Sequence, residues 1–370
     1  MNFLIFIPHM NIGGVERSFL SLSEALTQRG HKVTILTLKK NENILEPNTK
    51  AIQLISLNKN RALYSVKNIA NIINNLKPDV FISAQYYANI VAIISSKLAS
   101  EPTFTILSER LHLTRALEEY GFFKRKILSF LIKKTYKKAN LIYGNSDHVC
   151  EDLIENYTDK NTPIIKILNP ALFEKITYMS KEKVVDPWVT EDKIPILLYV
   201  GRLSPQKDIP TLLKTYKLLS EKIKVKLLII GDGPQKILIN EFIKNNPKLQ
   251  PYIKVNGFEL NPYKYFRHST VLLLTSKFEG LPNVLIEGQI LQIPIVATDS
   301  PGGTSEVLEN GKSGVLAKVG DHVDIARKIE GLLTDENKKK SIIERMSYSS
   351  KRFNSLNIAD RLIREIVKAK

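Results

Sequence analysis

Two glutamates at a defined spacing are the residues most suggestive of chemistry. Glu279 and Glu287 frame the stretch Glu-Gly-Leu-Pro-Asn-Val-Leu-Ile-Glu, with seven residues between them. Pro282 stands where a helix would begin, because proline is tolerated at the first helical position. We therefore expect Glu279 in the loop before that helix and Glu287 between one and two turns into it. A helix N-terminus attracts anions, so a phosphate group could bind there while both carboxylates face sugar hydroxyls. Taken singly, each glutamate would be interpreted as an exposed surface charge.

Two cations follow the end of a predicted strand. Gly201 permits a sharp exit from that strand, Arg202 comes next, and Lys207 lies five residues after Arg202. Arginine offers a planar fork of donors and lysine a point charge. Two cations at the carboxyl end of a strand suit a diphosphate leaving group, and two solvated surface charges are the alternative.

Glycine-rich turns follow several other predicted strands. Asn11–Arg17 contains two adjacent glycines before a helical pattern, and Gly231–Pro234 and Ser300–Glu306 are similar. Glycine lets the backbone approach a ligand closely, and the following helix offers free N–H groups. The turn Val255–Phe258 could meet a nucleobase through backbone groups. The spacing is not that of the three-glycine dinucleotide motif, and ordinary tight turns are the competing interpretation.

These residues are positioned by two series of short apolar runs, each run followed by a helical pattern. The first series comprises Phe3–Ile7, Lys32–Leu38, Val80–Ser83, Phe104–Leu107, Leu141–Tyr143 and Ile164–Leu168. The second comprises Pro195–Val200, Lys226–Ile230, Ile253–Val255, Val271–Leu274, Ile295–Ala297 and Gly314–Leu316. Strands that alternate with helices predict two α/β lobes with doubly wound parallel sheets. Such lobes bind ligands at the carboxyl ends of their strands, in the crevice between lobes.

Composition and length agree with two globular lobes. The chain has 370 residues, of which 43% are hydrophobic and 25% charged, and this length suits about two domains. The polar, aperiodic stretch Glu174–Asp192 is expected to be the linker, and Asn337–Lys370 is helical by pattern. The single cysteine, Cys150, excludes a disulfide framework and fits a reducing compartment. Met1–Pro8 resembles a buried strand rather than a signal peptide, and no apolar run is long enough to span a bilayer. We expect a soluble or peripheral, cytoplasmic protein.

The net charge of +17 leaves several partners open. Nucleic acid, an anionic membrane and anionic small molecules all suit a basic protein, and a lysine-rich composition without any partner is a further possibility. The nucleic-acid interpretation is the weakest, because no recognised reader motif occurs and the basic residues are not interleaved with stacking aromatics.

One segment combines basic and apolar residues. Phe122–Lys138 contains a helical face formed by Phe123, Ile127, Phe130 and Leu131, with basic residues on either side. A basic amphipathic helix suggests an anionic membrane surface and a lipid-linked acceptor. A helix packed into the core with a solvated basic face is the alternative.

Taken together, these motifs resemble glycosyltransferase family 4, the retaining enzymes with the GT-B fold, in its bacterial branch for cell-surface polysaccharides and lipid-linked oligosaccharides. The paired-glutamate stretch is nearly identical to the family's typical sequence motif, and the other motifs occur in the expected order. They are Gly13-Gly14-Val15-Glu16-Arg17, Gly201-Arg202 with Lys207, Gly231-Asp232-Gly233-Pro234 and Pro301-Gly302-Gly303. The resemblance covers residues 1 to about 330.

The resemblance implies two Rossmann-like domains that face a central cleft and bind different substrates. Residues 1–175 would form the acceptor-binding domain, to which a C-terminal helix of about residues 355–370 crosses back. Residues 190–354 would bind the nucleotide sugar. The implied donor site comprises Gly14, Gly201, Arg202, Lys207, Gly231, Gly257, Phe258, Gly280, Leu281, Pro282, Asn283, Val284 and Glu287.

The resemblance also implies roles for individual residues. Arg202 and Lys207 would hold the diphosphate, Glu287 would bind the ribose hydroxyls and Glu279 would lie near the donor sugar. The loop Gly280–Val284 would supply backbone N–H groups to phosphate. No metal and no cofactor are expected, because the cations and helix ends would do the work of a divalent ion.

The expected acceptor side departs from the family pattern at one position. Many members carry a histidine after the fourth strand, where this sequence has Arg110, with His112 two residues later. Glu109 and Arg110 are therefore the acceptor-side candidates, counted with Glu279, Arg202 and Lys207 as catalytic residues. A lone loop histidine is usually solvated or satisfied, so His112 is the weaker candidate. The implied acceptor side is completed by Gly13 and Gln85.

The implied reaction moves a hexosyl or N-acetylhexosaminyl unit from a nucleotide sugar, with UDP-sugar as the default, to a glycan hydroxyl. The acceptor would be a lipid-linked or surface glycan, polyprenyl-diphosphate-linked glycans included, in polysaccharide, lipopolysaccharide, capsule or glycoprotein-glycan biosynthesis. Retention allows either double displacement on a carboxylate or same-face attack, and the resemblance favours the latter. The expected protein is a monomer or weak dimer, either cytoplasmic or peripheral on the inner face of the cytoplasmic membrane. A nucleotide-sugar epimerase on the same scaffold is the rival enzyme.

Overall fold

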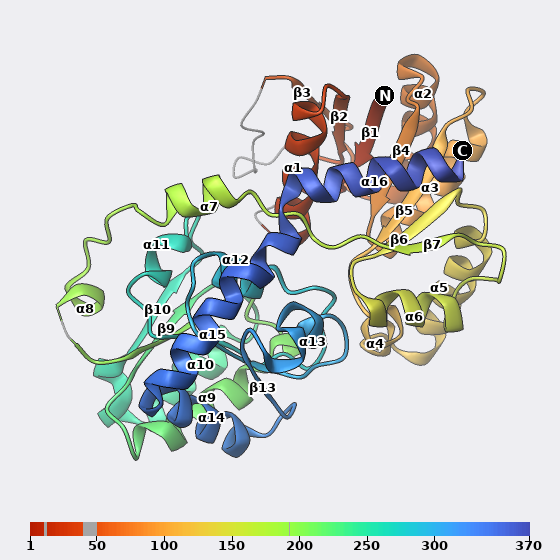
Figure 1. Cartoon of the computed structure of the whole chain (residues 1–370). Coiled ribbons are helices and arrows are strands. Elements are labelled where there is room, and N and C mark those ends of the chain that lie inside the picture. Colours follow the sequence, from red (N-terminus) through yellow and green to blue (C-terminus); the bar gives the residue numbers. More distant parts are fainter. Residues whose placement is uncertain (11–12, 40–49, 192) are drawn as a thin grey trace. The chain divides into compact units, whose positions relative to one another are not determined.

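The chain forms two compact units (Figure 1). The structure is a computed structural model that describes residues 1–10, 13–39, 50–191 and 193–370. Unit 1 consists of Met1–Ala171 and Phe353–Lys370, and unit 2 consists of Leu172–Arg352. Within these described ranges, no helix is both long enough and apolar enough to cross a bilayer.

Unit 1 is built on a seven-stranded sheet with the order β3-β2-β1-β4-β5-β6-β7, in which all neighbouring strands run parallel. The strands are β1 (Asn2–Phe6), β2 (Lys32–Thr37), β3 (Ile52–Ser56), β4 (Val80–Ala84), β5 (Phe104–Glu109), β6 (Leu141–Gly144) and β7 (Ile164–Lys166). The strand order reverses at β1, which lies between β2 and β4. The edge strand β3 is absent from the predicted series because it is mostly half-buried and lacks the continuous apolar run of the inner strands.

The helices of unit 1 pack on this sheet. They are α1 (Gly14–Gln28), the 3-10 helix η1 (Ala62–Ser65), α2 (Val66–Leu76), α3 (Tyr86–Leu98), α4 (Leu113–Glu118), α5 (Phe122–Tyr136), α6 (Asp147–Asn156) and α16 (Ser355–Ala369). The C-terminal helix α16 packs against α1 (Figure 1). It does so because Ile358, Leu362 and Ile366 recur every four residues and form one buried stripe.

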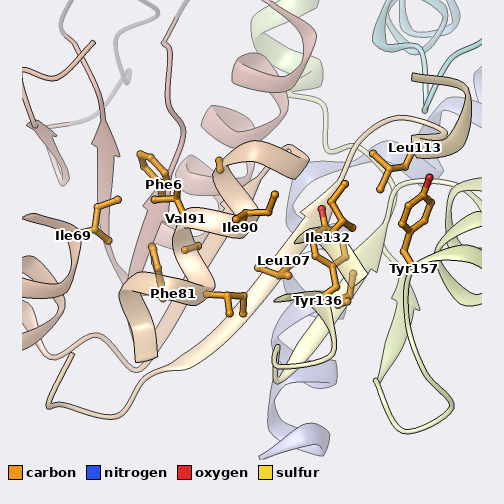
Figure 2. Close-up of a cluster of buried hydrophobic side chains, with 14 of the residues drawn as sticks. Phe6, Ile69, Phe81, Ile90, Val91, Leu107, Leu113, Ile132, Tyr136 and Tyr157 are labelled. Atoms are coloured by element: carbon orange, nitrogen blue, oxygen red, sulfur yellow. The ribbon is translucent and has the colours of Figure 1, made fainter. Parts of the chain in front are cut away.

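The core of unit 1 joins the sheet to its helices. Figure 2 shows Phe6 of β1, Phe81 of β4 and Leu107 of β5 among side chains contributed by the helices. Ile132 and Tyr136 of α5 belong to the same cluster and are fully buried. Helix α5 is therefore anchored to the sheet along one of its faces.

Unit 2 repeats this architecture with a six-stranded parallel sheet in the order β10-β9-β8-β11-β12-β13. The strands are β8 (Ile196–Val200), β9 (Lys226–Ile230), β10 (Ile253–Gly257), β11 (Val271–Leu274), β12 (Ile295–Thr298) and β13 (Val315–Ala317). The order reverses at β8, so the carboxyl end of β8 is the topological switch point at which such sheets bind ligands. The predicted parallel α/β class is confirmed for both units.

The helices of unit 2 include two in the segment predicted as a linker. They are α7 (Phe173–Met179), α8 (Pro187–Thr190), η2 (Pro205–Lys207), α9 (Ile209–Ser220), α10 (Lys236–Asn245), η3 (Pro247–Tyr252), α11 (Tyr263–Phe266), α12 (Asn283–Ile290), α13 (Thr304–Val307), η4 (Glu309–Gly311), α14 (His322–Thr334), α15 (Glu336–Ser349) and η5 (Ser350–Phe353).

The segment Glu174–Asp192, predicted as the linker, belongs to unit 2 as far as it is described, and it contains these two short helices. Helix α7 packs against α11 and α12 with Ile176 buried, and the Asp186 carboxylate caps α8 by accepting a hydrogen bond from the Trp188 N–H. Helices of seven and four residues are too short to show a periodic apolar pattern. Asp192 lies outside the described residues.

Candidate functional site

The predicted cations lie at the switch point of unit 2. After β8, the chain passes Gly201 and Arg202 and forms η2, which ends at Lys207. Arg202 is exposed, and within the described parts of the chain no acidic side chain pairs with its guanidinium. Asp208 then caps α9 from a left-handed conformation, with its carboxylate accepting a hydrogen bond from the Thr211 hydroxyl at 2.7 Å. The turn therefore carries two cations, the exposed Arg202 and, at the end of η2, Lys207.

Lys207 and Glu279 form an ion pair. The Lys207 ammonium contacts Glu279 Oε1, and both side chains are largely buried. The Ser276 hydroxyl donates to the same carboxylate oxygen at 2.5 Å. Because β8 and β11 are neighbours, residues 72 positions apart meet at one edge of the sheet. The predicted diphosphate residue and the predicted sugar-facing carboxylate are thus partners.

The loops that carry this pair are joined by their backbones. The Lys277 N–H donates to the Gln206 carbonyl at 2.8 Å, and the Gln206 side-chain amide donates to the Phe278 carbonyl at 2.9 Å. The Thr275 hydroxyl donates to the Lys207 carbonyl at 2.9 Å. These bonds fix the position of Lys207 relative to Glu279.

Glycines permit the turns after β8 and β9 to touch. A Cβ added to Gly231 would lie 1.9 Å from the Gly201 carbonyl oxygen, and the φ of Gly231 is +147°. The Gly201 N–H donates to the Ile230 carbonyl and the Gly231 N–H donates to the Gly257 carbonyl, at 3.0 and 2.7 Å. This backbone contact leaves no room for a side chain at position 231, so it requires glycine there whether or not the turn also binds a ligand. Beyond it, Gly257 has a φ of +71° and Phe258 is exposed.

The loop after β11 meets the loop after β12 in the same way. A Cβ on Gly302 would lie 1.9 Å from the Glu279 carbonyl oxygen. The Glu279 N–H donates to the Pro301 carbonyl at 2.9 Å, and the Gly303 N–H donates to the Gly280 carbonyl. The loop from Gly280 onward is therefore held in place at the N-terminus of α12.

Helix α12 carries the second glutamate. Pro282 is the N-cap of this helix and Asn283 is its first residue, so the expectation that Pro282 opens the helix was wrong by one position. The backbone of Pro282 is extended and not helical, which is why the helix begins one residue later. Glu287 lies between one and two turns into α12, as expected. It is buried, and the Tyr263 hydroxyl donates to its Oε1 at 2.9 Å.

Leu281, Asn283 and Val284 lie in or next to the first turn of α12. Leu281 is buried, whereas Asn283 and Val284 are half-buried. The structure therefore collects the predicted donor-side residues of unit 2 along one edge of its sheet. Tyr263 and Ser276, which hold the two glutamates, were not predicted, because neither stands in a recognisable motif.

The acceptor-side candidates of unit 1 are mostly internal. Glu109 ends β5 and is only 1% exposed, and Arg110 is 4% exposed. The Tyr136 hydroxyl donates to Glu109 Oε2 at 2.7 Å, and the Arg110 N–H donates to Glu109 Oε1 at 3.0 Å. Burial raises the pKa of Glu109 to about 7, although both hydrogen bonds act in the opposite direction.

The Arg110 guanidinium is enclosed by aromatic rings. It lies 4.5 Å from the centre of the Phe19 ring and 5.4 Å from that of Tyr143. Its Nη1 donates to the Asn169 side-chain oxygen at 2.5 Å, and its buried Nε has no hydrogen-bond partner within the described chain. Such enclosure fixes the guanidinium.

The remaining candidates of unit 1 lie at helix starts. Gln85 precedes α3 with a φ of +76°, a strained conformation for a residue other than glycine, and its side chain accepts a hydrogen bond from the Tyr87 hydroxyl. His112 precedes α4, with its Nδ1 3.4 Å from a carboxylate oxygen of Asp152. Gly13 caps α1 and Gly14 is the first residue of that helix.

No group of three or more histidine, cysteine, aspartate or glutamate side chains that could hold a metal ion occurs among the described residues.

Two family models match the chain. The model described as Glycosyltransferase Family 4 matches residues 12–170, and the model described as Glycosyl transferases group 1 matches residues 180–347. The two matches are consecutive and together span most of the chain.

Two Campylobacter jejuni proteins are similar in sequence. The chain is 30% identical over 237 residues to the N-acetylgalactosamine-N,N'-diacetylbacillosaminyl-diphospho-undecaprenol 4-alpha-N-acetylgalactosaminyltransferase. This match covers 64% of the chain and 62% of that relative, less than two thirds of its length. The chain is also 26% identical, over 100% of its length and 99% of the relative's, to the GalNAc-alpha-(1->4)-GalNAc-alpha-(1->3)-diNAcBac-PP-undecaprenol alpha-1,4-N-acetyl-D-galactosaminyltransferase.

Solved structures share the fold over their whole length. Anabaena HepE in complex with UDP-glucose has a TM-score of 0.79 at 18% identity, with 100% of both chains covered. Sucrose-phosphate synthase from Thermosynechococcus elongatus has a TM-score of 0.82 at 17% identity, also with 100% of both chains covered. These neighbours confirm the predicted GT-B fold with its two Rossmann-like domains. The two family models together span most of the chain, and the chain therefore belongs to glycosyltransferase family 4.

Proposed function

We propose that the protein transfers a hexosyl or N-acetylhexosaminyl unit from a UDP-sugar to a hydroxyl of a lipid-linked or surface glycan, with retention at the anomeric carbon. The observation that carries this proposal is the ion pair between Lys207 and Glu279 beside the exposed Arg202, at the switch point of unit 2. This edge combines fixed positive charge, a carboxylate and a helix N-terminus, which are the groups that a sugar diphosphate needs.

Lys207 and Arg202 would stabilise the departing nucleoside diphosphate. An ammonium has three donors, so Lys207 can keep its bond to Glu279 and still donate two protons to phosphate oxygens. The planar fork of Arg202 suits bidentate binding of phosphate. The first turn of α12 adds backbone N–H groups and the positive end of the helix dipole. We propose that this arrangement works without a metal ion.

Glu287 would bind the ribose hydroxyls of the nucleotide. Its Oε1 accepts a hydrogen bond from Tyr263, and this bond fixes the orientation of the carboxylate. Gly257 and Phe258 lie farther along the same edge, at the end of β10, where they would contact the base.

The surroundings of Glu279 favour same-face attack over double displacement. One of its carboxylate oxygens accepts hydrogen bonds from both Lys207 and Ser276. Charge-assisted hydrogen bonds stabilise a carboxylate and weaken it as a nucleophile. Glu279 would therefore orient the donor sugar, while the leaving diphosphate assists the incoming hydroxyl.

The acceptor assignment is supported by the names of the relatives. Both Campylobacter jejuni proteins are named for acceptors linked to undecaprenol through a diphosphate. We propose a lipid-linked glycan of this chemical class for the present protein. Glu109 and Arg110 would shape the acceptor side from within unit 1 rather than touch the reacting atoms, because both side chains are buried.

Two assays test the proposal. Thermal-shift measurements with UDP-, GDP- and ADP-sugars should show stabilisation by a UDP-sugar, since a ligand that binds only the folded state raises its melting temperature. Product analysis by NMR with a polyprenyl-diphosphate-linked acceptor should then show an anomeric configuration equal to that of the donor. An altered nucleotide sugar that accumulates without any acceptor would instead identify an epimerase.

A further inference from the structure

Helix α5 has apolar side chains on two opposite faces. Ile132 and Tyr136 face the core of unit 1 (Figure 2), and Leu128, one turn earlier, packs against the same core while partly buried. Opposite them, Phe123, Ile127 and Phe130 are 81%, 61% and 62% exposed. The stripe predicted from the sequence is therefore this outer one, and other residues of α5 anchor the helix. Large apolar side chains gathered on one exposed face mark an interaction surface.

The same outer face is strongly basic. The sequence contains no acidic residue from Tyr120 through Ser146. The exposed cations of this segment, on α5 and just beyond it, are Lys124, Arg125, Lys126, Lys133, Lys134, Lys137 and Lys138. The Lys126 ammonium lies 4.6 Å from the centre of the Phe122 ring, and that of Lys134 lies 5.9 Å from the centre of the Phe130 ring. Lysine stems thus lie along the apolar side chains while the charged ends stay outside.

Neighbouring elements also expose apolar side chains. Helix α3 packs against α5, and η1 packs against α3. Their exposed large apolar side chains are Ile94 and Leu98 on α3 and Leu63 and Tyr64 on η1. Helix α3, packed next to α5, and η1, packed next to α3, therefore also have exposed apolar groups.

We infer that the outer face of α5 docks on the surface of an anionic lipid bilayer. Aromatic and aliphatic side chains of such a helix enter the boundary between headgroups and acyl chains, and its lysines contact lipid phosphates. The basic side chains of α5 are complementary in charge to anionic lipid headgroups, which favours a bilayer as the partner. A second copy of the chain would bring two basic faces together, and like charges across an interface are unfavourable.

The docking helix is bonded to the acceptor-side residues. Tyr136, the last residue of α5, donates its hydroxyl hydrogen bond to Glu109 at the end of β5. The Asn89 side chain of α3 donates to the Tyr136 hydroxyl at 2.9 Å. Docking through α5 would hold these residues at a short, fixed depth from the bilayer, where a lipid-linked substrate resides.

Co-sedimentation of the full-length protein with phospholipid vesicles tests this inference. We expect binding at low salt to vesicles that contain phosphatidylglycerol, little binding to pure phosphatidylcholine, and release as salt is raised. The paired variant Phe123→Ser with Ile127→Ser should weaken binding by about tenfold or more. Lys133→Glu with Lys134→Glu should have a similar effect on anionic vesicles only.

Matched controls come from unit 2. Ile237→Ser with Tyr348→Ser removes two exposed apolar side chains, and Lys338→Glu with Lys340→Glu reverses two exposed charges. Both control pairs should bind vesicles like the parent protein, and melting temperatures should show that all four proteins fold. Equal binding by the α5 variants and the parent, or no binding by the parent, would overturn the inference. Self-association that the α5 variants abolish, without vesicle binding, would assign the face to a second copy.

No donor or acceptor is present in this assay. Its result is therefore independent of whether the protein transfers a sugar, and failure of either proposal leaves the other intact.

Discussion

The carboxyl edges of the two sheets use charge in different ways. In unit 2, Arg202 is exposed and Lys207 forms a largely buried pair with Glu279 from the neighbouring loop. In unit 1, Glu109 and Arg110 are buried among Tyr136, Tyr143 and Phe19. The first edge offers donors that a ligand can still reach, whereas the second uses its charges to fix its own structure. This difference supports our proposal that direct ligand chemistry lies in unit 2 and that the buried pair of unit 1 has a shaping role.

The largest expected effect lies in unit 2. Lys207→Ala removes a cation that would stabilise charge on the leaving group, and we expect kcat/KM to fall by about 10²–10³-fold, as for other preorganised donors. Arg202→Ala should act in the same direction. Lys214→Ala, which removes an exposed lysine of α9, should retain near-parental rates. Steady-state kinetics checks this, and near-parental rates in both site variants would refute the diphosphate assignment.

The backbone contacts of unit 2 give the next effect. Gly231→Ala places a Cβ against the Gly201 carbonyl and forces an unfavourable φ, so we expect the free energy of unfolding to fall by about 3 kcal/mol. Gly30→Ala is the matched control, because Gly30 also has a positive φ of +79° but has nothing within 4 Å of the added Cβ. Its expected loss is about 1 kcal/mol. Equal losses in chemical denaturation would show that the contact between the two turns is unimportant.

A pH-dependent effect is expected in unit 1. The pKa of Glu109 is raised by burial from its usual value of 4.5 to about 7. Between these values the unfolded chain releases a proton that the folded chain keeps. The contribution of Glu109 to stability is therefore fully present below pH 4.5 and is lost as the pH rises to about 7.

Glu109→Gln removes this titration and keeps an oxygen that can accept the hydrogen bond from Tyr136. The stability of the parent relative to this variant should therefore fall by roughly 3 kcal/mol between pH 4.5 and pH 7. Denaturation midpoints measured at several pH values check the prediction. Parallel curves for the two proteins would mean that Glu109 is not protonated within the folded unit.

The smallest expected effect concerns Glu287. Tyr263→Phe deletes the hydrogen bond to this buried carboxylate, and we expect a loss of about 1–2 kcal/mol in stability. Because Glu287 would also become less well oriented, the KM for the donor should rise more than kcat falls. A change in kcat without a change in KM would mean that Tyr263 does not contribute to donor binding.

The sequence predicts the elements at the unit 2 edge well because these elements depend on local patterns. Glycine turns, a proline before a helix and residues at strand ends are all encoded within a few positions. Neighbouring parallel strands then bring Lys207 and Glu279 to one edge. The direct pairing of these two side chains and the supporting bond from Ser276 depend on rotamers, which no pattern in the sequence specifies.

The features missed in both units have physical reasons. The pair formed by Glu109 and Tyr136 joins positions 27 residues apart through tertiary packing. The role of α5 was left open because apolar residues occur on both of its faces, so periodicity alone does not identify the buried face. The helices α7 and α8 were missed because they are too short to show a periodic apolar pattern. The edge strand β3 was missed because it is mostly half-buried and has no continuous apolar run.

A crystal structure of the protein with bound UDP tests the central claim most directly. We expect the diphosphate oxygens within hydrogen-bonding distance of the Lys207 ammonium and the Arg202 guanidinium, next to the first turn of α12, with the ribose at Glu287. A diphosphate bound away from the carboxyl end of β8, with Arg202 and Lys207 not in contact with it, would contradict the proposed donor site.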